Sequence, residues 1–129
     1  VEFVELDELF ERCDIVSYHL ALSDQANGII HSRDLKSLRQ GAVFVNTARA
    51  QLVEKDSLIE ELSSGRLFAA LDVFESEPIL PDDPLLKLSN VILTPHVGFA
   101  TRNAMDKLFE IALNNARALL IGQSPKRVA

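Results

Sequence analysis

The sequence of 129 residues has no tryptophan, a single cysteine and no long apolar run. A membrane-spanning helix needs about 20 consecutive apolar residues, so we expect no membrane partner. The lone Cys13 excludes a disulfide within the chain and suits a reducing compartment, so we expect a cytoplasmic protein. Basic residues are outnumbered, with 13 Lys and Arg against 19 Asp and Glu. The net charge of −6 and the lack of a basic run disfavour a nucleic-acid partner.

Glycine is also scarce, and its positions exclude a common phosphate-binding motif. The chain has five glycines, and none of them forms the pattern Gly-X-Gly-X-X-Gly. A dinucleotide site normally uses this glycine-rich turn, where the amides at a helix N-terminus face the pyrophosphate. The acidic residue that binds the ribose is normally found about 20 positions after such a turn. Without the turn, no acidic residue of this chain can be assigned that role. We therefore expect this chain alone to bind a dinucleotide weakly or not at all.

Two patterns alternate along the chain, and the first is the helical period of apolar residues. It occurs in four segments, at residues 6–13, 32–41, 58–65 and 101–122. Ser32 and Thr101 are the predicted N-caps of the second and fourth helices. Gly41, Gly65 and Gly122 are the predicted ends of the last three, because glycine readily adopts the left-handed conformation that terminates a helix.

The second pattern is short, apolar and rich in β-branched residues, as strands are. It occurs at residues 15–20, 42–45, 68–74 and 91–94. Residues 42–45 are nearly all apolar, which is typical of a strand buried on both faces of a parallel sheet. The alternation of such strands with helices predicts an α/β fold, with helices on the faces of a parallel sheet. A long irregular segment, residues 75–89, is predicted to be either functional or an excursion over the surface.

Polar side chains lie at the carboxyl ends of the predicted strands. His19 lies near the end of the first strand, and Arg49 follows the second. Asp72 lies near the end of the third strand, Glu77 follows that strand, and His96 follows the fourth. Ligands of open α/β sheets bind beyond these ends, so we expect the side chains to converge. A cation for an anionic substrate, with a histidine and a carboxylate, is what proton-coupled hydride transfer on an acid requires.

Each of these residues also has a structural interpretation. Taken singly, Arg49 and Glu77 fit solvated surface charges, His96 fits a hydrogen-bonded structural histidine, and His19 fits a strand cap. Asp72 lies within an apolar run and is harder to explain in this way, because a buried carboxylate must be paired or hydrogen-bonded. The three histidines lack the spacing of a metal site, so we expect no metal.

Four segments together resemble the D-isomer-specific 2-hydroxyacid dehydrogenases. They are DIVSYHLAL (14–22), GAVFVNTARAQLVEKDSLIEEL (41–62), GRLFAALDVFESEP (65–78) and NVILTPHVGFAT (90–101). They occur in the order and spacing of that family, which includes phosphoglycerate, glyoxylate/hydroxypyruvate and D-lactate dehydrogenases. The resemblance implies an oxidoreductase that interconverts small D-2-hydroxy acids and 2-oxo acids, with NAD or NADP as cofactor.

The resemblance also implies roles for individual residues. Arg49 would bind the substrate carboxylate and help to polarise the keto group, a task for which a bidentate guanidinium is suited. His96 would be the general acid/base, and Glu77 would be the carboxylate that favours its protonated form and fixes its orientation. Asp72 would face the nicotinamide carboxamide. The remaining positions that would line the cofactor, largely through backbone atoms, are Leu20, Thr47, Ala48 and Gly98.

The enzymes of this family are much longer, so the resemblance implies that residues 1–129 are the C-terminal half of a Rossmann domain. The half with the glycine-rich turn and the substrate domain would then be absent. In the family's strand order 3-2-1-4-5-6, this chain would hold the contiguous strands from the fourth onward. Its first strand would leave an unpaired edge, through which we expect a homodimer or another self-association.

Three positions depart from the family pattern. Ala50 replaces the usual glycine after the arginine and requires a negative φ there, or mild strain. The segment after His19 lacks the usual proline, and Phe99 replaces a small residue. Two other functions stay open: a non-catalytic half-Rossmann module that self-associates, and a dehydrogenase-like corepressor that acts by binding partners. We expect the isolated chain to be inactive in every case.

Overall fold

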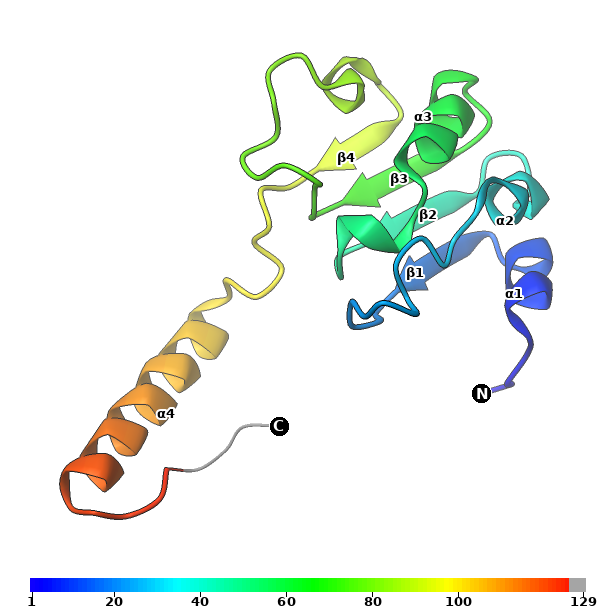
Figure 1. The fold of residues 1–129 in the computed structure, drawn as a ribbon. Coiled ribbons are helices and arrows are strands. Elements are labelled where there is room, and N and C mark those ends of the chain that lie inside the picture. The colour runs from blue at the N-terminus through cyan, green and yellow to red at the C-terminus, as the bar shows by residue number, and fades with distance from the viewer. Residues whose placement is uncertain (126–129) are drawn as a thin grey trace. The chain divides into compact units, whose positions relative to one another are not determined.

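The computed structural model describes residues 1–125, which fall into two compact units. The first unit, Val1–His96, contains a sheet with its helices (Figure 1). The second unit begins at Val97 and contains α4 (Arg102–Leu120). The elements of the first unit are α1 (Leu6–Arg12), β1 (Ile15–Tyr18), α2 (Ser32–Ser37), β2 (Val43–Asn46), η1 (Ala50–Leu52), α3 (Lys55–Ser63), β3 (Phe68–Leu71), η2 (Pro84–Lys87) and β4 (Val91–Leu93).

The strands are all parallel and follow one another across the sheet in the order β1-β2-β3-β4. Ile15 pairs with Val43, and Val43 pairs with Phe68, so the first three strands start in register. A parallel strand must be reached by a crossover, and α2 and α3 provide two of them. The predicted α/β architecture is confirmed, and the carboxyl ends of the four strands lie along one edge.

The strands end earlier than predicted. β1 and β3 end at Tyr18 and Leu71, before the predicted Leu20 and Phe74, and β4 ends one residue before the predicted Thr94. The apolar runs continue past these ends, but there the chain has already turned into the loops that carry the polar side chains. An apolar run alone does not mark the end of a strand, because buried loop residues have the same composition.

Side chains alternate between a buried face and a more exposed face of the sheet. Val16 and Phe44 are 1% and 0% exposed, and side chains of α1, α2 and α3 join them in one core. Ile15 and Phe68, on the other face, are 63% and 48% exposed. The prediction that residues 42–45 are buried on both faces is therefore wrong for this chain, because Val43 and Val45 are only partly buried.

The boundaries of α2 differ from the prediction at both ends. Its N-cap is His31 rather than Ser32, and the backbone N–H of His31 donates to the Asp34 carboxylate at 2.7 Å. This is one half of a capping box, which satisfies a backbone group that the helix leaves unpaired. The helix ends at Ser37, so Gly41 does not terminate it. Gly41 has a φ of +82° and instead lies in the turn before β2.

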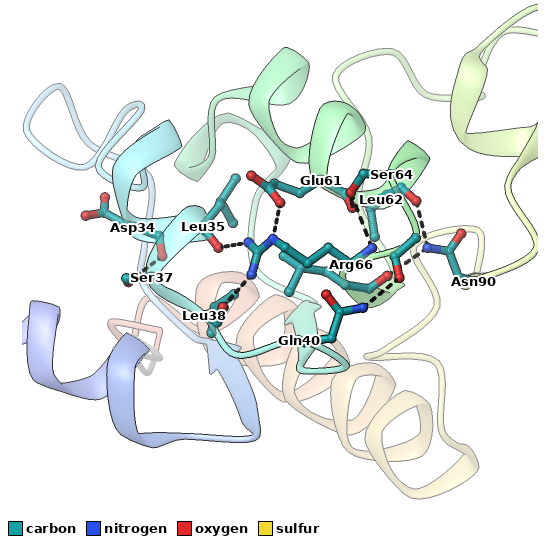
Figure 2. Close-up of polar contacts among 12 residues, drawn as sticks. Asp34, Leu35, Ser37, Leu38, Gln40, Glu61, Leu62, Ser64, Arg66 and Asn90 are labelled. Atoms are coloured by element: carbon teal, nitrogen blue, oxygen red, sulfur yellow. Dashed lines mark hydrogen bonds and ion pairs between the residues drawn. The ribbon is translucent and has the colours of Figure 1, made fainter.

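Arg66, which lies just before β3, joins α2 and α3 through its guanidinium group (Figure 2). It donates to the carbonyl oxygens of Leu35 and Leu38 at the end of α2, and to the carboxylate of Glu61 in α3. The side chains of Arg66 and Glu61 are only 24% and 8% exposed. The last carbonyl groups of a helix lack partners within it, so a buried donor at this point stabilises the contact between α2 and α3.

The helix α4 begins and ends as predicted. The hydroxyl of Thr101 accepts the backbone N–H of Ala104 at 3.2 Å, which makes Thr101 the N-cap. Ile121 is the C-cap, and Gly122 follows with a φ of +73°. Over residues 1–125, no helix is long and apolar enough to cross a bilayer.

Candidate active site

Arg49, Glu77 and His96 come together at the carboxyl edge of the sheet. Arg49 follows β2, Glu77 lies in the loop after β3, and His96 follows β4. They line one hollow of about 330 Å³, together with Ala50, Gln51, Val73, Phe74 and Glu75. Three side chains that are distant in the sequence therefore share a site, as the shared edge of parallel strands predicted.

The imidazole of His96 is paired with the carboxylate of Glu77. Nδ1 of His96 lies 2.7 Å from Oε2 of Glu77, and each side chain is 39% exposed. The other carboxylate oxygen, Oε1, accepts the backbone N–H of Phe74 at 3.0 Å. The hydrogen bond from His96, and then that from Phe74, lower the pKa of Glu77 from its ordinary value. Glu77 is therefore an ionised acceptor that orients the ring, with Nε2 directed away from it.

His96 has an unusual backbone conformation. Its φ is +53°, and within residues 1–125 it is the only non-glycine residue with a positive φ. Its N–H donates to the carbonyl oxygen of Thr94 at 3.0 Å, which closes a three-residue turn around Pro95. Left-handed backbone is sparsely populated by residues other than glycine and persists where its surroundings enforce it, often at functional sites. The sequence gives no signal for this conformation except the proline before it.

The turn that carries Arg49 is built by Asn46, the last residue of β2. The Asn46 side chain is 1% exposed and bonds at both ends: Oδ1 accepts the N–H of Ala48 at 3.0 Å, and Nδ2 donates to the carbonyl oxygen of Arg49 at 2.8 Å. No role for Asn46 was predicted from the sequence. An asparagine after an apolar strand is the available signal, because its side chain often forms such turns. Ala50 keeps a negative φ, so it is not strained.

Asp72 is buried directly after β3, as expected from its apolar surroundings. It is 4% exposed, and its Oδ1 accepts a hydrogen bond from the hydroxyl of Thr94. Its backbone N–H donates to the carbonyl oxygen of Asn46 at 3.0 Å. Asp72 thus connects the ends of β2, β3 and β4 beside the site. It does not line the hollow that Arg49 shares with His96.

Three other predicted cofactor positions, Leu20, Thr47 and Ala48, do not line this hollow. Leu20 is 45% exposed in the loop after β1, and Thr47 and Ala48 belong to the turn after β2. Gly98 belongs to the second unit, so it is not placed relative to the others. His19 lies close to Ser17, with 2.9 Å between its Nε2 and the Ser17 hydroxyl. This local contact agrees with the structural interpretation of His19.

A second hollow adjoins the His96–Glu77 pair on the side of β4. Its volume is about 450 Å³, and it is lined by Phe74, Glu77, Pro78, Ile79, Leu93, Thr94, Pro95 and His96. The lining is mostly apolar, and the pair therefore borders both hollows. This second hollow was not predicted from the sequence, because it forms only where the loop after β3 passes β4.

The histidines of the chain lie in separate local groups. His31 has its Nδ1 2.9 Å from Oε1 of Glu54, whereas His96 contacts Glu77. Among residues 1–125, no three histidine, cysteine or acidic side chains are grouped closely enough to hold a metal ion.

Comparison with known sequences relates the chain to a family of dehydrogenases. The family model of the D-isomer specific 2-hydroxyacid dehydrogenase NAD binding domain matches residues 1–98. A glyoxylate reductase from Thermofilum pendens is 40% identical over 126 residues, which cover 97% of this chain and 37% of that enzyme. The chain therefore spans little more than a third of the length of this relative.

Solved structures show the same fold. A protein from Thermus thermophilus superposes with a TM-score of 0.90 at 37% identity, over 97% of this chain and 40% of that one. A D-lactate dehydrogenase from Lactobacillus jensenii, solved with NAD+, superposes with a TM-score of 0.86 at 27% identity. That superposition covers 98% of this chain and 42% of the D-lactate dehydrogenase.

Proposed function

The chain belongs to the D-isomer specific 2-hydroxyacid dehydrogenase family, and on this basis we propose that it forms part of an oxidoreductase that interconverts D-2-hydroxy acids and 2-oxo acids. Within that enzyme, residues 1–129 are the C-terminal half of the NAD(P)-binding Rossmann domain. The observation that carries the proposal is the hollow shared by Arg49, Glu77 and His96. These residues supply an anion-binding group and a paired acid/base in one place.

Arg49 binds the substrate carboxylate. A guanidinium donates two parallel hydrogen bonds to a carboxylate, which fixes the orientation of the 2-oxo acid as well as its position. The turn that Asn46 builds holds the backbone of Arg49 in place through a 2.8 Å hydrogen bond to its carbonyl oxygen. The substrate carboxylate is therefore held by a hydrogen-bonded turn at the end of β2.

His96 moves the proton. In the direction of reduction, the protonated ring donates from Nε2 to the carbonyl oxygen of the substrate, which becomes the hydroxyl oxygen of the product. In the direction of oxidation, neutral Nε2 accepts the hydroxyl proton. In both directions Oε2 of Glu77 accepts the hydrogen bond from Nδ1 of His96, with 2.7 Å between the two atoms. The carboxylate also stabilises the positive charge of the imidazole ring when the ring is protonated.

The nicotinamide dinucleotide, when bound, supplies or accepts the hydride at C2 of the substrate. The residues of this chain fit its nicotinamide end, because the buried carboxylate of Asp72 is an acceptor of the kind a carboxamide N–H requires. Leu20, Thr47, Ala48 and Gly98 complete the proposed cofactor contacts.

No glycine-rich turn for the phosphates occurs in the sequence. Calorimetry of the isolated chain with NADH is therefore expected to give no saturable heat up to roughly millimolar concentration; micromolar affinity would contradict this.

A second proposal concerns assembly of the isolated chain. Among the described residues, β1 pairs only with β2, so its other edge has unpaired backbone groups, and Ile15 beside it is 63% exposed. Such an edge favours pairing with another strand. We propose that the chain forms a homodimer, or another self-associated state, through β1. Sedimentation that shows a stable monomer at tens of micromolar would reject the proposal.

A chimera tests the proposed function. This chain would replace the matching 126 residues of the glyoxylate reductase from Thermofilum pendens, and glyoxylate-dependent oxidation of NADH and NADPH would be measured. We expect turnover by the chimera, since the rest of the enzyme supplies what this chain lacks. A folded chimera that binds the dinucleotide but does not reduce any 2-oxo acid would refute the proposal.

A further inference from the structure

The loop that carries Glu77 lies largely at the surface. Residues 75–78 are exposed, and the loop extends from the end of β3 to η2. The hydrogen bond between Glu77 and the N–H of Phe74 is local, so it cannot hold the loop against the rest of the sheet. The position of Glu77 relative to His96 therefore depends on contacts elsewhere in the loop.

Lys55, the first residue of α3, contacts the loop on both sides of Glu77. Its Nζ lies 2.8 Å from Oδ2 of Asp83 and 3.7 Å from Oε2 of Glu75. Glu75 precedes Glu77 and Asp83 follows it, so one ammonium group joins the two limbs of the loop. No role for Lys55 was predicted from the sequence, because only the folded loop brings Glu75 and Asp83 to it.

The contact with Asp83 is anchored in the core. Oδ1 of Asp83 accepts the backbone N–H of Leu85 at 3.0 Å, which caps η2, and Leu85 is 6% exposed. The Asp83 side chain is itself only 10% exposed, against 32% for Lys55. By contrast, Arg12 and Glu2 form an ion pair whose side chains are 49% and 67% exposed. Partial burial makes the Lys55–Asp83 pair stronger than such surface pairs, which contribute little.

The electrostatics of the two groups agree with this geometry. The hydrogen bond to Asp83 raises the pKa of Lys55 from its ordinary value. Burial acts to raise the pKa of Asp83, but the hydrogen bonds from Lys55 and Leu85 outweigh it, so the pKa of Asp83 is lowered. Both groups are therefore charged at neutral pH.

The same ion pair adjoins the turn that carries Arg49. Lys55, Glu75 and Asp83 line a hollow together with Asn46 and Ala50. The lysine therefore borders the same hollow as the turn of Arg49, while its ion pairs are with the loop of Glu77.

We propose that Lys55 is a positioning residue, which holds Glu77 against His96 by clamping the two limbs of the loop through Glu75 and Asp83. The effect of Lys55 on turnover rests on the proposed function, whereas the effect of Lys55 on the Glu77–His96 pair does not. Lys55 does not line the hollow that Arg49 shares with Glu77 and His96. Its loss loosens the carboxylate that orients the imidazole ring.

The pKa of the Glu77 carboxyl, measured by carbon-detected NMR titration of the 129-residue chain, tests the clamp. We expect Lys55→Gln to raise this pKa toward its ordinary value, because the hydrogen bond from His96 weakens. We expect Asp83→Asn to raise it as well, although removal of a negative charge would by itself lower it. The two variants change the charge in opposite senses, so only a positional effect moves the pKa in one direction. Asparagine can still cap η2, so Asp83→Asn should fold.

Two further variants complete the design. Lys55→Arg keeps the charge and should leave the Glu77 pKa as it is in the unaltered chain. Arg12→Gln removes a positive charge from an exposed pair and serves as the matched control, with no change expected. An unchanged pKa in Lys55→Gln, or a lowered one in Asp83→Asn, would overturn the clamp.

In the chimera, Lys55→Gln should lower kcat by roughly tenfold and change KM by less than about twofold, as expected when orientation but not binding is lost. Lys55→Arg should keep the kcat of the unaltered chimera. A change in KM with kcat unchanged in Lys55→Gln would overturn the positioning role. An inactive but folded chimera would refute the proposed function, and the NMR titration would still decide on the clamp.

Discussion

Nδ1 of His96 lies 2.7 Å from Oε2 of Glu77, while Oε1 of the same carboxylate accepts the N–H of Phe74. An ionised carboxylate can only accept, so the hydrogen of the first bond belongs to Nδ1, and the proton that His96 would transfer in the proposed reaction belongs to Nε2. The pair borders both hollows at the carboxyl edge of the sheet. The proposed acid/base chemistry and the proposed clamp both act through this contact.

Acid should destabilise the chain in part through Glu77. Its pKa in the folded state is lowered from 4.5, first by the hydrogen bond from His96, so the folded state favours the ionised form. The stabilisation is present above the ordinary pKa and is lost as pH falls through the lowered value. Urea unfolding from pH 7 to pH 3 should therefore show Glu77→Gln less stable than the unaltered chain at pH 7 and equal to it at the acid end. Glu60→Gln, at an exposed position on α3, is the control for loss of a carboxylate.

Arg49→Lys should weaken substrate binding in the chimera. A lysine keeps the charge but cannot form the two parallel hydrogen bonds of a guanidinium, so kcat/KM should fall by roughly 10- to 100-fold. Most of the loss should appear in KM, because the ground state already uses the carboxylate contact. Arg33→Lys, at a site whose side chain is 79% exposed, is the matched control. An equal kcat/KM for Arg49→Lys and the unaltered chimera would remove Arg49 from the site.

Tyr18→Phe should leave stability unchanged or increase it. Tyr18 is 5% exposed, and its hydroxyl has no hydrogen-bond partner among the residues that the structure describes. Burial raises the pKa of the phenol, as expected for a group far from water. Removal of an unsatisfied buried hydroxyl is expected to gain up to about 1 kcal/mol in the free energy of unfolding. A loss of more than about 1 kcal/mol would mean that the hydroxyl has a bonded partner.

The matched variant is Tyr18→Leu, which also removes the ring. The Tyr18 ring lies 6.0 Å from that of Phe10 and 5.8 Å from that of Phe44, between centroids. Its loss leaves a cavity in the core and should cost about 2 to 4 kcal/mol. The difference between the two variants separates the ring from the hydroxyl in urea unfolding.

The sequence predicted the parts of the site that follow from topology. The carboxyl ends of parallel strands share an edge, so Arg49, Glu77 and His96 were expected together, and the structure brings them together. The N-cap Thr101 and the terminating Gly122 of α4 were likewise predicted from local chemistry. These features depend on period, spacing and short-range hydrogen bonds, which a sequence displays directly.

Part of what the sequence did not predict depends on neighbours that are distant along the chain. Lys55 gains its role from a loop that folds beside it, and the apolar hollow beside His96 forms where the loop after β3 passes β4. The turn of Asn46 and the left-handed backbone of His96 are local, but the composition of these segments does not display them. The cap of α2 was placed on Ser32 because serine is a common cap, whereas His31 holds that position through its contact with Asp34.

The most direct test of the account is His96→Ala in the chimera with the Thermofilum pendens enzyme. Turnover of the 2-oxo acid should fall by at least about 1,000-fold, because the proton donor to the carbonyl oxygen is lost. The dissociation constant for NADH should change by less than about twofold, since the imidazole acts on the substrate. Turnover within about threefold of the unaltered chimera, measured on protein of unchanged fold, would contradict the role assigned to His96 and with it the proposed function.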